Sequence, residues 1–167
     1  MKKIITFMLI CVIITTCKER EEEGEGIIIE HIIPNEEVTA FFEEYLPSSI
    51  HVFQECSFFA INDKSGDKCV MINSVDEFRK SFSCSSTTLP AIDFESYTLI
   101  IGHYTVMCIC DYVIEQEIVV KSKKVILNLI WHCPDGAYAS SGMMCYWGIY
   151  PKISNKNIIV EQKRIRI

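Results

Sequence analysis

Apolar and polar positions recur along this chain with two different periods, and each period predicts a different element. Between Asn35 and Leu46 the apolar residues recur at three- and four-residue spacing, the period of an amphipathic helix. Asn35 can cap that helix and Pro47 can end it. A second helix is predicted to open at Ser74, because Ser74 and Glu77 have the spacing of a capping box. The side chains expected to be buried are Val38, Phe41, Phe42, Tyr45 and Leu46 in the first helix and Val75, Phe78 and Phe82 in the second.

Most of the remaining chain has the β-branched and aromatic composition of strands. Short polar turns separate many of these runs, which favours antiparallel pairing of neighbours. We therefore predict an α+β fold, with a single antiparallel, strongly curled β-sheet and two short helices against it or at one end of it. The predicted strands cover residues 27–33, 50–61, 68–72, 97–102, 108–120, 125–131, 143–150 and 158–167.

The first sixteen residues have the pattern of an export signal. Lys2 and Lys3 precede an uncharged apolar run that ends at Thr16. This run is shorter than the ~20 residues that a membrane-spanning helix needs. Cys17 follows directly, after the small pair Thr15-Thr16 and the branched Ile14.

This arrangement resembles the lipobox of bacterial lipoproteins, in which a peptidase cleaves before a cysteine that carries diacylglycerol. The resemblance covers only the leader, and it implies lipidation at Cys17 and a membrane as partner through the lipid anchor. Several acyl chains hold a protein stably at a bilayer without a transmembrane helix. The alternative is an ordinary cysteine beside the cleavage site of a soluble exported protein.

Residues 18–26 are acidic, with five glutamates against one lysine and one arginine. Such a segment cannot bury apolar surface, and we expect a solvated tether. An acidic cluster after the lipidated cysteine also resembles the surface-export signal of Bacteroidetes-type lipoproteins, which implies an outer-membrane protein at the cell surface. A plain spacer on a periplasm-facing lipoprotein is the alternative. The predicted organisation is a signal peptide over 1–16, lipidated cysteine, tether and lead-in over 17–34, and one domain over 35–167.

Charge and cysteine content limit the partners and the redox chemistry. The formal net charge is −6, and removing Lys2 and Lys3 with the leader leaves −8. Nucleic acid is not expected as a partner, because its binding needs clustered Lys and Arg. Cys11 leaves with the leader and Cys17 would carry lipid. Buried thiols and one or two disulfides are expected among the other cysteines, which are Cys56, Cys69, Cys84, Cys108, Cys110, Cys133 and Cys145.

Four aromatic residues near the C-terminal end are candidates for a binding site. Aromatic side chains bury a large area at low entropic cost, and they bind sugar rings and partner proteins. The alternative is that alternate members of the set are core residues of the sheet. The four candidates are Tyr138, Tyr146, Trp147 and Tyr150.

A cysteine–histidine set is the candidate for chemistry. Adjacent strand residues point to opposite faces, so His132 is poorly placed to activate Cys133. Zinc sites favour paired Cys-x2–4-Cys knuckles, whereas Cys108 and Cys110 form Cys-x-Cys. No metal, cofactor or catalytic residue is therefore predicted. The isolated His31 and His51 are predicted to be surface or helix-flanking residues. The residues that would have to converge in a thiol or zinc site are His103, Cys108, Cys110, His132, Cys133 and Cys145.

A second resemblance covers residues 70–167. The chain here is similar to Bacteroidetes lipoproteins and to the C-terminal domain of the protease-complex subunit PrcB, in segments 74–78, 90–94 and 97–102 and the hairpins that follow them. It departs from the PrcB-like pattern at residues 103–110, which lack the expected glycine-rich turn. The resemblance implies an accessory or interaction domain without catalytic residues. We therefore predict a lipid-anchored outer-membrane binding protein whose partner is an envelope protein or a glycan. The alternative is a thiol- or zinc-dependent extracytoplasmic enzyme.

Overall fold

The computed structural model describes residues 26–46, 56–58, 68–106, 112–133, 142–154 and 157–166. Cys17 and the leader lie outside these residues, as do Cys108, Cys110 and Tyr138. The elements, in chain order, are β1 (Ile27–Glu30), α1 (Glu36–Tyr45), β2 (Lys68–Ile72), α3 (Val75–Ser81), β3 (Tyr97–Val106), β4 (Tyr112–Val120), β5 (Lys124–Cys133), β6 (Gly142–Pro151) and β7 (Asn157–Arg166).

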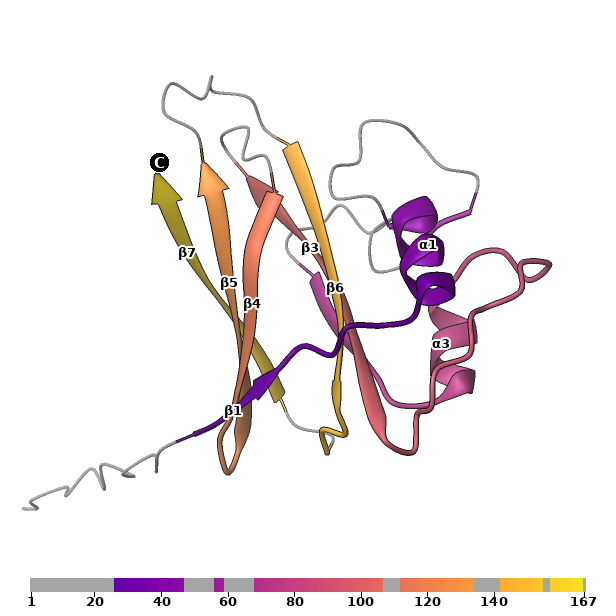
Figure 1. Ribbon diagram of the computed structural model, residues 1–167, viewed down its shortest axis with the longest axis horizontal. Helices are drawn as coiled ribbons and strands as arrows, with labels where there is room; N and C mark the ends of the chain where they lie inside the picture. Colours follow the sequence, from indigo (N-terminus) through magenta and orange to yellow (C-terminus); the bar gives the residue numbers. More distant parts are fainter. Residues whose placement is uncertain are drawn as a thin grey trace, which may run out of the picture.

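These elements form three layers (Figure 1). The outer sheet has the strand order β1-β4-β5-β7, and the middle sheet has the order β2-β3-β6. Both helices lie on the face of the middle sheet that points away from the outer sheet. The middle sheet therefore has a core on each side, a first core beneath the helices and a second core between the two sheets.

The α+β class is confirmed, but a single, strongly curled sheet is wrong. The two sheets are separate and open, and β7 pairs parallel with β5 from Lys124↔Asn157 onward instead of with its chain neighbour β6. The physical reason is that β3 is apolar on both faces. Leu99 and Ile101 point into the first core and Ile100 into the second, so one layer cannot cover both faces.

The helices begin where the sequence predicts. The Asn35 side chain accepts a hydrogen bond from the Val38 N–H at 2.9 Å, and the Ser74 hydroxyl accepts one from the Glu77 N–H at 3.2 Å. The Glu77 carboxylate accepts from the N–H of Asn73, one residue before the position that a standard capping box uses. The prediction for Val75 is wrong, since its side chain is 61% exposed in the first turn of α3.

The first core is mostly aromatic. Phe42 of α1 is fully buried and stacks on Trp147 of β6, with ring centroids 4.3 Å apart. The same ring also stacks on Phe58 and Phe78. Such pairs add to the free energy gained from area burial and fix how the helices lie on the sheet. The buried members are Val38, Phe41, Phe42, Leu46, Phe58, Ile72, Phe78, Phe82, Phe94, Leu99, Ile101, Cys145 and Ile149.

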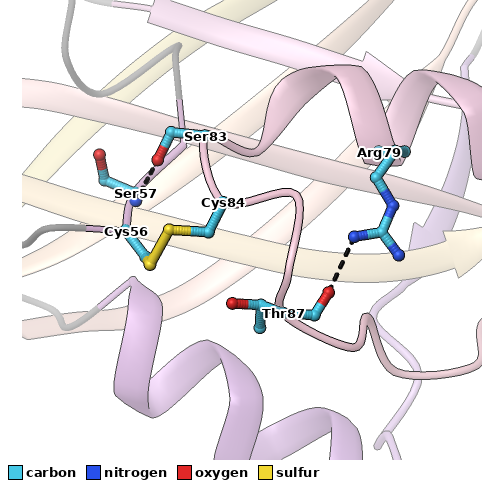
Figure 2. The surroundings of a disulfide bond; sticks show 6 residues. All are labelled: Cys56, Ser57, Arg79, Ser83, Cys84 and Thr87. Carbon is cyan, nitrogen blue, oxygen red and sulfur yellow. Dashed lines mark hydrogen bonds between the residues drawn. A yellow bond between two sulfur atoms is a disulfide. The ribbon is translucent and has the colours of Figure 1, made fainter.

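A disulfide between Cys56 and Cys84 joins residues 56–58 to the loop after α3 (Figure 2). Next to it the Ser57 N–H donates to the Ser83 hydroxyl at 2.9 Å, and the Ser83 N–H donates to the Ser57 carbonyl at 2.9 Å. The prediction of buried thiols together with one or two disulfides is confirmed in the described residues by this one disulfide and by Cys145, which carries a buried free thiol; Cys69 carries a partly buried one.

The chain between β1 and α1 connects the two sheets at one side. β1 pairs antiparallel with β4, and two residues later the Ile32 N–H donates to the Ile149 carbonyl of β6 at 2.8 Å. Part of the predicted lead-in is thus built into the fold. His31 lies edge-on to Trp147 and Tyr150, with ring centroids 6.1 and 5.7 Å away. It is half-buried and lies in the segment that leads into α1, so it fits the helix-flanking alternative better than the surface one; His51 lies outside the described residues.

Candidate functional site

A cavity of about 290 Å³ lies between the two sheets, on the side opposite the β1 crossing. Its wall includes β2 and β7, which are edge strands of their sheets among the described residues. The wall combines apolar, aromatic and polar side chains, as small-molecule sites do. The described residues that line it are Lys68 and Cys69 of β2, His103 and Tyr104 of β3, Tyr146 of β6, and Ile158, Val160 and Gln162 of β7.

Tyr146 is held across the middle sheet by its hydroxyl, which donates to the Lys68 carbonyl on β2 at 3.3 Å. Gly102 lies between these residues on β3, directly opposite Tyr146 in register. A Cβ on Gly102 would collide with the Tyr146 ring and with the Lys68 carbonyl. The absence of a side chain at this position is what allows the Tyr146 ring to reach β2.

Cys69 presents an uncharged thiol to the cavity. Burial raises the pKa of this thiol to about 11, and a hydrogen bond with Tyr146 acts in the opposite direction. At neutral pH the thiolate is a very small fraction, and the thiolate is the nucleophilic form. The Cys69 side chain therefore behaves as a small apolar group with a weak hydrogen-bonding capacity.

Gln162, a residue that borders the cavity, has an unused hydrogen-bond acceptor. The Oε1 atom of Gln162 is buried and has no hydrogen-bond partner in the described structure. The indole N–H of Trp131, on the neighbouring strand β5, is likewise buried without a partner there. Trp131 stacks on the cavity residue Tyr104 with ring centroids 6.2 Å apart. Buried polar atoms normally have a hydrogen-bond partner. A molecule from outside the chain could supply the missing partner at this end of the second core.

The predicted aromatic platform is not exposed as a surface. Tyr150 is fully buried and donates to Gln116 Oε1 at 3.1 Å, while Trp147 is partly buried and stacks on Phe42. Tyr146 is only 3% exposed, yet its side chain lines the cavity. Tyr138 lies outside the described residues. Coverage of both faces of β6 explains the burial, since neither set of alternating side chains points to solvent.

The cysteine–histidine set is only partly placed. Cys145 is directly opposite His103 in register, but it points into the first core, whereas Cys69 points into the second. Burial raises the pKa of the Cys145 thiol to about 12, which disfavours the reactive thiolate. His132 and Cys133 lie in β5, and their side chains are outside what the structure describes. Within the described residues, no group of three or more His, Cys, Asp or Glu side chains could hold a metal ion.

Sequence reasoning missed the cavity and most of its wall. Cys69 and Gln162 belong to strands that were predicted, but the packing of those strands against each other was not. One local signal was available at Gly102, because a glycine inside a strand often marks a close approach by another group.

No family model, curated protein or solved structure matches this chain significantly. In the part of the chain that the structure describes, no helix is long and apolar enough to cross a membrane.

Proposed function

We propose that this protein is a lipid-anchored binding protein of the outer membrane, displayed at the cell surface, and that it acts without catalysis. The observation that carries the proposal is the sequence at Cys17, where an uncharged apolar run ends in Ile14-Thr15-Thr16 and an acidic segment follows. Lipid on Cys17 would hold the chain at the membrane, and residues 18–26 would separate the folded part from it.

The arrangement of the folded part is compatible with an anchor at its N-terminal side. The first strand, β1, is one edge of the outer sheet, and β7, which lines the cavity, is the opposite edge. The tether, residues 18–26, spans up to ~30 Å when extended. The anchor would therefore leave the cavity side of the domain free for a ligand.

The chemistry of the cavity supports binding more than catalysis. A nucleophile needs a lowered pKa or an adjacent base, and the pKa of the Cys69 thiol is raised by burial. A neutral thiol, a tyrosine hydroxyl and a glutamine amide recognise a ligand by shape and hydrogen bonding. For partners outside the cavity we propose another envelope protein or a glycan.

The test of the anchor is Cys17→Ser expressed from the full gene in the native type of cell. The wild-type protein is expected in the outer-membrane fraction, with an N-terminal peptide at Cys17 whose mass includes diacylglycerol. Cys17→Ser should lose both the added mass and the membrane retention. Cys11→Ser is the matched control, because that cysteine lies inside the leader and should not change lipidation. An unmodified Cys17 in the mature wild-type protein would contradict the proposal.

Surface display is tested separately through the tether. Replacing Glu21, Glu22 and Glu23 with Gln preserves Cys17 and the length of the segment but removes the acidic cluster. This variant is expected to stay lipidated and to become resistant to protease added to intact cells. Unchanged protease sensitivity in the triple variant would show that the acidic segment is only a spacer.

A further inference from the structure

The two sides of the second core are closed differently. On the side of β4 and β6, residues 27–32 pair first with β4 and then with β6, and His31 lies against Trp147 and Tyr150. On the side of β2 and β7 the two sheets leave the cavity between them. Entry between β2 and β7 therefore leads into the interior of the sandwich.

The size of the cavity suits one small organic molecule. An apolar cavity of roughly 150 Å³ is enough to hold a benzene ring. The cavity here, at about 290 Å³, has room for one substituted ring but lies near the lower end of ligand pockets. A polymer such as a peptide or an oligosaccharide could not enter it as a whole.

The chemistry of the wall limits the ligand further. Tyr104, Ile158 and Val160 offer apolar contacts, and Gln162 Oε1 offers a buried acceptor that has no partner in the described structure. An ion without a partner is costly to bury. Lys68 also borders the cavity, but it pairs in register with His103, which lies opposite Cys145 of the first core, so its charged side chain is on the other face of the middle sheet. A neutral ligand with an O–H or N–H group fits these conditions.

We propose that the cavity between β2, β3, β6 and β7 binds one neutral, ring-sized molecule whose hydrogen-bond donor is accepted by Gln162. This proposal deepens the binding function proposed above by naming a ligand class. It does not depend on lipid at Cys17, so the two proposals can fail separately.

The test uses two fluorinated probes that differ in the donor. 4-Fluorophenol carries an O–H group and 4-fluorotoluene carries a methyl group in its place. Binding to the full chain purified in nanodiscs is measured by fluorine NMR, with empty nanodiscs as the blank. Both probes are expected to bind in a saturable way, because both fit the cavity. Absence of saturable binding of 4-fluorophenol above the blank would overturn the proposal and leave only a water-filled cavity.

Variants on β7 locate the binding. Val160→Phe fills the cavity and is expected to lower the affinity for both probes at least tenfold. Ile159→Phe is the matched control, because Ile159 is 43% exposed and does not line the cavity. Gln162→Leu is expected to lower the affinity for 4-fluorophenol about fivefold, which is the effect of one lost hydrogen bond. The affinity for 4-fluorotoluene should not change. Equal affinities in Val160→Phe and Ile159→Phe, or equal effects of Gln162→Leu on both probes, would contradict the proposal.

A measurement on the unchanged protein covers the case in which Val160→Phe does not fold. Met71 packs against the second core and Met144 lies in it, whereas Met143 packs against the first core. With methionine methyl groups labelled by carbon-13, 4-fluorophenol should shift the signals of Met71 and Met144. A response confined to Met143 would place the probe outside the cavity and overturn the proposal.

Discussion

Gly102 is the residue on which the position of Tyr146 depends. Tyr146 lies opposite it in register and reaches over it to the Lys68 carbonyl. Strands generally disfavour glycine, because it has no side chain to pack and loses more entropy on folding. Here the missing side chain makes space for an aromatic ring that lines the cavity.

Gly102→Ala is therefore expected to destabilise the fold by about 1–3 kcal/mol, since the new Cβ collides with the Tyr146 ring and the Lys68 carbonyl. Urea unfolding measures this loss. In a Tyr146→Ala background the same substitution should cost less, because one of the two collisions is gone. Strictly additive losses in the double variant would show that the ring does not constrain Gly102.

Residue-level predictions succeeded where the interaction spans only a few positions. Asn35 and Ser74 cap their helices as expected, because each cap bonds to an N–H three residues away. The role of Tyr146 could not be predicted in this way, because the hydroxyl bonds to a residue 78 positions earlier. A single sequence does not show which distant strand a side chain will meet.

At the scale of elements, the Cys56–Cys84 disulfide holds residues 56–58 against the segment that follows α3. Phe58 and Phe82 form an isolated antiparallel bridge beside it, and both rings lie in the first core. The bond thus fixes an irregular part of the chain to the aromatic cluster beneath the helices. Figure 2 shows the neighbouring Ser57–Ser83 hydrogen bond on the same connection.

Removing the disulfide with Cys56→Ser and Cys84→Ser is expected to lower the free energy of unfolding by about 2–4 kcal/mol. The bond closes a loop with a sequence separation of 28, and opening it restores chain entropy to the unfolded state. Urea unfolding with and without a reductant measures the effect. The reductant should destabilise the wild-type protein and leave the double variant unchanged, and an equal response of both would contradict the assignment.

The hairpin between β4 and β5 could be predicted from the local sequence pattern. The predicted strands end at Val120 and begin again at Val125, which leaves residues 121–124 for the turn, and the Lys121 N–H donates to the Lys124 carbonyl at 2.9 Å. The partner of β7 was not predictable by the same reasoning, because a parallel neighbour arises from a crossover between the sheets and has no turn of its own.

At the scale of the whole molecule, residues 27–32 close one side of the second core. His31 belongs to this crossing, and burial lowers its pKa below the usual value of 6.5. Gly148 lies beneath it, where a Cβ would come within 2.8 Å of the His31 ring. A neutral imidazole packs edge-on against the two aromatic rings there, whereas an imidazolium would have to be desolvated.

His31 should therefore make stability fall on acidification. The folded state binds the His31 proton less tightly than the unfolded chain does, so the stabilisation is present above pH 6.5 and is lost as pH falls through the folded pKa. Urea unfolding at pH 7.5 and pH 5 measures the loss. His31→Phe keeps a ring at the site without a titrating group, and its loss between these pH values should be smaller. Equal losses in both proteins would show that His31 does not contribute.

The sequence by itself determined the elements that depend on near neighbours: the two helices and their caps, the strands that the structure describes, the β4–β5 hairpin, and the pattern at Cys17 on which the proposed anchor rests. Only the tertiary structure decided that there are two sheets, that the tyrosines of β6 are buried, and that a cavity lies between the two sheets. Hydrophobic periodicity indicates which face of an element is buried, because backbone geometry fixes the direction in which each side chain points. It does not state which other element covers that face, because many distant partners would bury the same apolar area equally well.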